Sequence, residues 1–291
     1  MADLPQSDWI TSVIEDFIAN SPENNLQNRT GEKAFENPLV GFAGGADPIF
    51  DDYKTHVGPF HWTPLEIFRT TFAESRVEAG DLTVISWILP QTSRTRADNR
   101  KQDRFPAERW ARARVFGEKV NEKIRAHVVD RLKEKGIQAV APMLSPLWSR
   151  EMSPRYGYAS KWSERHAAYA AGLGTFGLCD GLITESGKAM RTGSVVARCR
   201  IQASPRPYTD HHAYCLFYAT GTCGKCIKRC PVGAVSENGH DKEKCKAYMR
   251  GDQVRGYIKE QYGFEGKGCG LCQTKVPCEA VNPVKIQNKT A

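Results

Sequence analysis

Cysteines are the residues of this chain most able to do chemistry, and they are concentrated toward its C-terminal end. Ten cysteines occur in 291 residues, and eight of them lie between Cys215 and Cys278. Residues 223–231 have the spacing C-x2-C-x3-C-P, and a C-x2-C pair follows at 269–272. Thiolates at such short spacings are typical ligands of metal ions and iron–sulfur clusters.

These eight thiols divide into two sets of four, and four is the number that one [4Fe–4S] cluster requires. The motif at 223–231 is similar to the bacterial ferredoxin motif C-x2-C-x2-C-x3-C-P, but Thr220 occupies the place of its first cysteine. The nearest thiol before it is Cys215. We therefore expect two [4Fe–4S] clusters with these ligands: Cys215, Cys223, Cys226, Cys230, Cys245, Cys269, Cys272 and Cys278.

Two structural zinc sites are the alternative, because each C-x2-C pair could form half of a four-cysteine site. However, zinc ribbons rarely need a C-x3-C-P unit, and 42 residues separate the two pairs. Iron–sulfur clusters are favoured for this reason. Cys179 and Cys199 precede the module, and each is predicted to be a small buried side chain.

Basic residues accompany the cysteines. The chain has a net charge of +8, and residues 205–291 hold 14 Lys and Arg against 8 Asp and Glu. Such an excess could bind nucleic acid, but the cations are scattered singly and have no aromatic platform beside them. Clusters held by four thiolates are anionic, so the same cations could balance their charge.

The composition describes an ordinary globular protein, with 40% hydrophobic and 25% charged residues and a mean hydropathy of −0.51. No apolar run approaches the ~18 residues of a membrane span, so we expect no contact with a membrane. The first nine residues are acidic and lack the pattern of a secretory signal. A reducing cytoplasmic location is expected, in which cysteines bind metals rather than form disulfides.

Hydrophobic spacing predicts the elements that must position this module. They are, in chain order, a helix at 7–20, an irregular segment at 21–62 whose aromatic residues pack against the core, a strand at 82–89, a long helix from about Pro106 to Gly136, a strand at 137–144, a helix at 162–171, and strands at 182–183 and 194–201. The Pro-rich residues 205–207 mark a boundary. The predicted domains are an N-terminal packing segment at 1–79, an α/β domain at 80–204 and a two-cluster domain at 205–291.

A second signature lies at residues 163–195, with Glu164, the AGLG of 171–174, Gly177 and the Leu-Ile of 182–183 as its markers. Together with the cysteine module, this segment resembles the epoxyqueuosine reductases and the related reductive dehalogenases over about residues 80–280. The resemblance implies an α/β (α+β) nitroreductase-like, corrinoid-binding domain. A bacterial-ferredoxin-like domain with two clusters would follow it.

The resemblance also sorts the cluster ligands. One cluster would be held by Cys230, Cys245, Cys269 and Cys272. The other would use Cys223 and Cys226, but the remaining two family positions fall on Thr220 and Val276. Cys215 and Cys278 lie close to these positions in the sequence and are expected to substitute.

Further roles follow from the resemblance. The clusters would pass low-potential electrons from an external ferredoxin or flavodoxin to a cobalamin. The expected corrinoid contacts are Gly172, Leu173, Gly174, Gly177 and Arg191, with the glycines allowing close backbone approach and the arginine neutralising an anion. Alternatively, the AGLG segment only ends its helix, with Gly172 as a C-cap.

The proton donor is expected at Tyr158, because this residue lies six positions before Glu164, where epoxyqueuosine reductases have a catalytic aspartate. The dehalogenases use a tyrosine as the acid, and Arg155 or Lys161 could stabilise its phenolate. Tyr156 is an equally placed alternative, and an ordinary half-buried tyrosine is another.

The expected function is reductive elimination on an organic substrate at a corrinoid. Epoxyqueuosine in tRNA is the usual substrate of the family, but Tyr158 replaces the aspartate, and 13 residues after Cys278 leave no room for C-terminal helical repeats. A small molecule, as in the dehalogenases, is therefore the favoured substrate. Two other functions stay open: an electron-transfer protein without a corrinoid, and a zinc-stapled nucleic-acid module.

Overall fold

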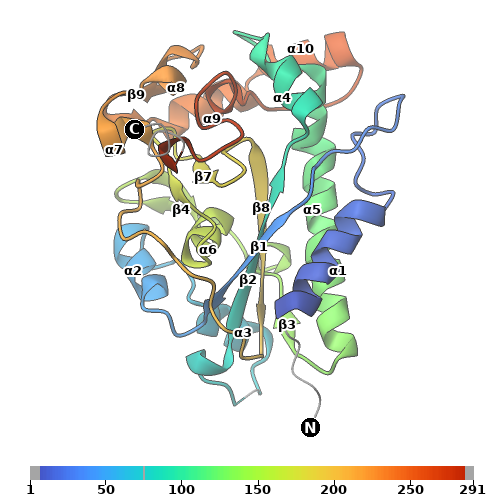
Figure 1. Cartoon of the computed structure of the whole chain (residues 1–291), viewed down its shortest axis with the longest axis vertical. Coiled ribbons are helices and arrows are strands. Elements are labelled where there is room, and N and C mark those ends of the chain that lie inside the picture. The colour runs from blue at the N-terminus through green and yellow to red at the C-terminus, as the bar shows by residue number, and fades with distance from the viewer. Residues whose placement is uncertain (1–6, 75, 286–291) are drawn as a thin grey trace.

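The centre of the molecule is a four-stranded antiparallel sheet with the order β1-β2-β8-β3 (Figure 1). Its strands are β1 (Leu39–Gly44), β2 (Thr83–Pro90), β8 (Met190–Ala197) and β3 (Ala139–Val140). The structure is a computed structural model that describes residues 7–74 and 76–285. All eight residues of β2 are buried, because the strand lies inside the sheet and both of its faces are covered.

Side chains of β2 alternate between two hydrophobic cores. Ile85, Trp87 and Leu89 face the core that includes residues of α1 (Ser7–Asn20) and α5 (Glu108–Glu134). Val84 and Ile88 face the other core, which includes residues of α6 (Glu164–Ala170) and α2 (Ile49–His56). Figure 1 shows α1 and α5 on one side of the sheet and α6 and α2 on the other. The arrangement is a sheet between two helical layers.

The remaining elements connect and extend these layers. Around the sheet they are α3 (Pro64–Thr71), α4 (Ser93–Arg100), β4 (Arg150–Ser153), β5 (Gly157–Ser160), β6 (Gly174–Phe176) and β7 (Leu182–Thr184), with 3-10 turns at Ala79–Asp81 and Pro142–Leu144. In the cysteine-rich segment they are α7 (Leu216–Thr220), α8 (Lys225–Lys228), β9 (Val235–Ser236), β10 (Gly239–His240), α9 (Lys242–Arg250), α10 (Asp252–Tyr262) and a 3-10 turn at Leu271–Gln273. Figure 1 shows this segment at one end of the sheet.

The helix predicted at 7–20, the strand at 82–89 and the long helix before Gly136 are confirmed. The segment at 21–62 is more regular than expected, since it contains β1 and α2. The strand predicted at 137–144 is confined to β3, because Pro142 opens a 3-10 turn.

The mixed α/β fold is confirmed, whereas the ferredoxin-like character of the C-terminal part and the domain limits stay predictions. The outermost residues of the first and last predicted domains, 1–6 and 286–291, lie outside the described residues. Every helix within 7–74 and 76–285 is too short or too polar to span a bilayer.

Candidate functional site

The cysteine-rich segment brings four thiols of the predicted ligand set to one small cavity. Cys215, at the start of α7, lines this cavity together with Cys223, Cys226 of α8 and Cys278. Three of the four are buried, at 7–9% exposure, and Cys223 is half-buried. We call these four residues the inner thiol group. The structure thus places Cys215 and Cys278 beside the C-x2-C pair, as the sequence analysis expected.

The other four cysteines are half-buried, and we call them the outer thiol group: Cys230, Cys245, Cys269 and Cys272. Burial and the neighbouring Cys245 and Cys230 sulfurs together raise the pKa of the Cys269 thiol to about 12. Cys245 and Cys230 therefore lie within electrostatic reach of Cys269. The Cys230 sulfur also accepts a hydrogen bond from the Ala234 amide at 3.1 Å, which helps to fix its position.

Cys179 and Lys188 lie between the two thiol groups. The Cys179 thiol is within hydrogen-bonding reach of Cys226 in the inner group and Cys272 in the outer group. The Lys188 ammonium donates to the Cys179 sulfur at 3.3 Å and is 3% exposed. Burial disfavours its charge, but the thiolate forms of Cys179 and Cys278 outweigh this and raise the pKa of Lys188 well above its usual value.

Cys179 was predicted to be a small buried side chain, and its 6% exposure confirms this, whereas Lys188 was not singled out. The only sequence signal for either was proximity to the AGLG segment, since Cys179 follows it by five residues. What the sequence did not reveal is that both residues lie next to members of the two thiol groups.

The donor set fits four-thiolate clusters. The four inner thiols line one cavity, Cys269 lies within electrostatic reach of Cys230 and Cys245, and the buried Lys188 lies near Cys179 and Cys278, where it can balance anionic charge. Among the described residues, no three side chains of His, Cys, Asp or Glu converge as they would around a single bound metal ion.

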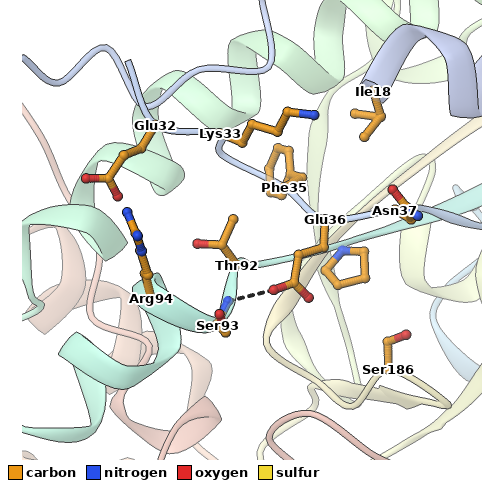
Figure 2. A pocket seen from close by; sticks show the side chains of 11 residues that line it. Ile18, Glu32, Lys33, Phe35, Glu36, Asn37, Thr92, Ser93, Arg94 and Ser186 are labelled. Carbon is orange, nitrogen blue, oxygen red and sulfur yellow. Dashed lines mark hydrogen bonds between the residues drawn. The ribbon is translucent and has the colours of Figure 1, made fainter. Parts of the chain in front are cut away.

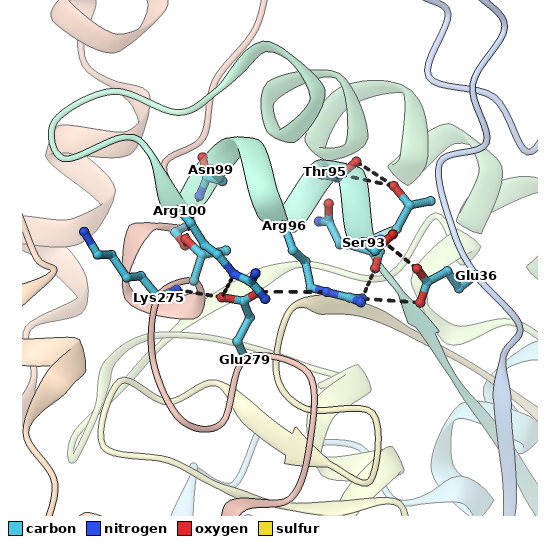
Figure 3. A network of polar contacts seen from close by, with 12 residues as sticks. Glu36, Ser93, Thr95, Arg96, Asn99, Arg100, Lys275 and Glu279 are labelled. Carbon is cyan, nitrogen blue, oxygen red and sulfur yellow. Dashed lines mark hydrogen bonds and ion pairs between the residues drawn. The ribbon is translucent and has the colours of Figure 1, made fainter.

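Cys278 is positioned by a polar network that reaches the sheet (Figure 3). The adjacent carboxylate of Glu279, 5% exposed, accepts from Arg100 of α4 at 2.6 Å and from the Lys275 amide at 2.7 Å. Arg96 lies 3.9 Å from the same carboxylate and also pairs with Glu36 at 3.3 Å. Two main-chain hydrogen bonds join the turn before β8 to the backbone at 278–279. The loop that carries Cys278 is thus fixed by the sheet half of the molecule.

Tyr158 lies on β5, where its hydroxyl is buried and has no hydrogen-bond partner among the described residues. Three cations surround its ring: Lys246 at 4.3 Å, Arg150 at 5.0 Å and Arg250 at 5.8 Å from the ring centre. The expected partners lie elsewhere, since Arg155 covers Tyr156 and Lys161 covers Trp62. Sequence reasoning missed these three cations because β4 and α9 meet only in the folded chain.

Arg191 belongs to the same basic region. Burial and the like charge of Arg114 lower the pKa of Arg191 to about 9, and its Nε atom has no hydrogen-bond partner among the described residues. Its nearest carboxylate is Glu118 of α5, at 3.8 Å. Arg250 lowers the pKa of Arg114 in turn. The structure therefore connects Arg191 to the cations beside Tyr158.

Glu164, a marker of the sequence signature, is buried behind this region. Its carboxylate pairs with Arg125 of α5 at 3.0 Å and accepts from the hydroxyl of Ser194. Burial raises the pKa of Glu164 to about 7, although Arg125 and Ser194 oppose the shift. The Glu164 carboxylate therefore links α6 to α5 and to the sheet, which is a structural role.

The glycines of the AGLG segment approach the chain's own backbone. A Cβ atom on Gly172 would lie 2.2 Å from the Pro205 carbonyl oxygen, and one on Gly174 would lie 2.2 Å from that of Ile183. Gly172 also has a positive φ of 77°, as a helix C-cap does. Leu173 contacts the strand β1 at Gly41. Close packing within the fold thus explains these residues, and their contact with a corrinoid stays a prediction, as does that of Gly177.

A separate open groove of about 710 Å³ lies between the N-terminal segment and the start of α4 (Figure 2). None of the predicted site residues lines it. Its carboxylates are engaged by neighbours, since Glu36 accepts from the Ser93 amide at 2.6 Å and Glu32 pairs with Arg109 at 2.7 Å.

Sequence comparison finds relatives over part of the chain. A segment of 121 residues is 31% identical to the epoxyqueuosine reductase of Bacillus anthracis, covering 40% of this chain and 29% of that protein. The enzyme of Bacillus cereus matches to the same extent. The match therefore spans less than a third of these curated relatives. No protein-family model matches the chain.

Structure comparison finds a similar fold in reductive dehalogenases. A catabolic enzyme in complex with 3-bromo-4-hydroxybenzoic acid matches 96% of this chain and 38% of its own, with a TM-score of 0.52 and 15% identity. A dehalogenase described as B12-dependent matches 86% of this chain and 31% of its own, with a TM-score of 0.52 and 17% identity. The comparisons confirm the resemblance carried by the AGLG segment and the cysteine module, and they relate this chain to the family of epoxyqueuosine reductases and reductive dehalogenases.

Proposed function

We propose that this chain is an iron–sulfur reductase that passes low-potential electrons through two [4Fe–4S] clusters to a corrinoid, where an organic substrate undergoes reductive elimination. The relatives named above are reductases, which supports an enzyme of this kind. We propose an external ferredoxin or flavodoxin as the electron donor. A small molecule is the preferred substrate, and tRNA is the second choice.

The observation that carries the proposal is that four thiols line one cavity at one end of the sheet, while Cys230 and Cys245 lie near Cys269 in the same segment. The inner group would hold one cluster and the outer group the other. Because Cys179 and Lys188 are close to members of both groups, the two clusters would be neighbours, as electron transfer between them requires.

A corrinoid in its reduced form would supply a strong nucleophile or one-electron donor, and the basic region beside Tyr158 is the part of this chain that fits it. There the buried Nε atom of Arg191, which has no hydrogen-bond partner among the described residues, suits an amide or phosphate oxygen of such a group. Tyr158 would give a proton to the reacting substrate, and the cations around its ring would stabilise the remaining negative charge.

An electron-transfer protein without a corrinoid is the second candidate. The packing of Gly172 and Gly174 against the chain's own backbone favours it, because these glycines then need no ligand to explain them.

The test is the metal and cofactor content of protein purified without oxygen and incubated with cobalamin. The proposal expects about eight irons, as two four-iron clusters require, an equal amount of sulfide, and cobalamin retained through gel filtration. The same iron content without cobalt would favour the electron carrier. Colourless protein with two zinc ions would refute both.

Tyr158→Phe should lower turnover at least tenfold while iron and cobalt contents stay unchanged, since it removes only the hydroxyl. Tyr156→Phe is the matched control, because Tyr156 lies two residues away in the same hairpin and is exposed. Unchanged turnover in the Tyr158 variant would leave this residue a structural role only.

A further inference from the structure

Three cations lie against the ring of Tyr158, and three more lie within electrostatic reach of these or of one another; we call the six the basic cluster. They come from α5, β4, β8, α9 and the loop after α10, and they are Arg114, Arg150, Arg191, Lys246, Arg250 and Lys267. Arg150 and Lys267 are exposed at the rim, while the other four are half-buried. The basic cluster therefore has a partly buried interior and a side that is open to solvent.

The negative charge facing these cations is small. Glu118 lies 3.8 Å from Arg191 and 3.9 Å from Arg114, and it is shared with Arg125 at 3.3 Å. Lys246 pairs with Glu243 at 3.3 Å. Arg150 and Arg250 form no ion pair or hydrogen bond within residues 7–74 and 76–285. Positive charge thus exceeds negative charge by several units.

Two arginines outside the basic cluster have close carboxylate partners. Arg100 donates to both oxygens of Glu279, as Figure 3 shows, and Arg109 contacts both Glu32 and Asp98. The buried Nε atom of Arg96 lacks a hydrogen-bond partner among the described residues, but its guanidinium group still pairs with Glu36, whereas Arg250 of the basic cluster has a buried Nε atom without a partner and no ion pair. A buried N–H without an acceptor costs about 1–3 kcal/mol, so the Arg250 donor is placed for a partner from outside the chain.

Arg191 is assigned to the corrinoid by the proposed function. Two other donors of this region are buried and lack a hydrogen-bond partner among the described residues: the Tyr158 hydroxyl and the Nε atom of Arg250. Repulsion among the cations adds to the cost. Burial lowers the pKa of Arg114 and of Arg150, and Arg250 lowers both further. An anion with several acceptor oxygens would satisfy the donors and remove the repulsion together.

We propose that the basic cluster binds an oxyanion, a phosphate or carboxylate group carried by the substrate, beside the Tyr158 hydroxyl. This inference rests on the proposed function for the identity of the site, and it restricts the substrate to anionic molecules. The guanidinium groups would hold the oxyanion and so place the reacting end of the substrate near the phenol.

Calorimetric titration with inorganic phosphate, and separately with benzoate, tests the proposal on protein purified without oxygen. We expect saturable binding of at least one of them. Arg250→Gln should weaken it at least tenfold, because the substitution removes a charge that has no other partner. Arg131→Gln, the same change in an exposed residue at the far end of α5, should leave binding unchanged.

Thermal unfolding distinguishes this role from a purely structural one. In buffer without phosphate or carboxylate, Arg250→Gln should raise the unfolding temperature, since it relieves repulsion, and phosphate should no longer stabilise the variant. A lower unfolding temperature that phosphate still raises would overturn the proposal, as would wild-type protein that binds neither anion.

Titration of protein loaded with cobalamin separates the two possible sources of the oxyanion. Binding that persists after loading supports a group on the substrate. Binding lost on loading would assign the site to the phosphodiester of the corrinoid and overturn the substrate role. Protein that lacks iron and cobalt yet still binds phosphate would refute the proposed function without refuting the oxyanion site.

Discussion

The sheet half of the molecule and its cysteine-rich segment bury different kinds of groups. Around the sheet, two large hydrophobic cores are built from β2 and the helices on either side. Some buried polar groups there are paired within the sheet half: the Trp87 indole donates to Asn121 at 2.9 Å, and Arg125 pairs with Glu164 at 3.0 Å. Hydrophobic burial on both faces of the sheet is thus what holds this half together.

The cysteine-rich segment has little core of its own. Its helices α7 and α8 have five and four residues, and no residue of α9 is fully buried. What it gathers instead is thiols, together with Arg250, whose buried Nε atom lacks a hydrogen-bond partner among the described residues. Small segments of this kind depend on staples such as bound metals. Under the proposed function, the clusters would therefore be part of the folding of this segment as well as of its chemistry.

The largest expected effect is that of removing iron, which should destabilise the cysteine-rich segment and leave the sheet half almost unchanged. Protein treated with a chelator should lose amide protection over residues 215–278, with exchange roughly a hundredfold faster where protection depends on the bound clusters. Amides of β2 and β8 should change little, because hydrophobic burial holds them. Hydrogen exchange with mass spectrometry measures both regions in one sample. Equal protection before and after treatment would mean that the segment folds without metal.

Cys230→Ala should remove about four of about eight irons, since it takes one thiolate from the outer group and leaves the inner group complete. Cys199→Ala is the matched control, because Cys199 is buried in the core next to α1 and α5. Iron analysis of both variants tests the assignment of Cys230 as a cluster ligand. Equal iron contents would contradict the ligand assignment.

Glu279→Gln should destabilise the link between the two regions by about 3 kcal/mol, because it leaves Arg100 and Arg96 without their shared carboxylate. We expect the inner thiol group to bind iron less tightly as a result. Glu265→Gln, which breaks an exposed pair with Lys259, should have no measurable effect. Iron release at increasing chelator concentration compares the variants, and identical curves would exclude this role of Glu279.

The smallest expected effect concerns acid stability in the sheet half. Burial lowers the pKa of His61 to about 4, whereas an unfolded histidine titrates near 6.5. The unfolded chain therefore binds more protons between these values, and stability should rise with pH from about 4 to 6.5. At pH 5, protonation of His61 in the unfolded chain lowers the free energy of unfolding by about 2 kcal/mol, and His61→Phe should remove this loss. At pH 7 the substitution should remove almost none. Unfolding temperatures measured from pH 4 to 6.5 test this prediction, and the same dependence of unfolding temperature on pH in both proteins would contradict it.

Sequence patterns predicted the parts of the fold that have strong periodicity. The helix α5 has an apolar stripe along its length, and β2 is an unbroken apolar run, so both were found. The strand β1 (LVGFAG) was missed, because its two glycines hide the pattern and its pairing with β2 is a tertiary event. The residue composition of β1 does not reveal that this strand pairs with β2.

The candidate site likewise has a part that the sequence predicted and a part that it did not. The thiol groups were predicted because short spacings along one segment already bring their cysteines close. The basic cluster was not predicted, apart from Arg191, since α5, β4 and α9 are distant in the sequence. Lys188 was missed for the same reason, because its thiol neighbours lie on other segments.

The turn before β8 has a consequence for the order of events during biosynthesis. The Lys188 amide donates to the Cys278 carbonyl at 2.9 Å, and the Ala189 amide donates to that of Glu279 at 3.1 Å. A newly made chain can close the inner thiol group only after this turn has taken its place beside β8. Cluster insertion would therefore come late in folding, after the sheet has formed. Chains in which the sheet has not formed would fail to retain iron.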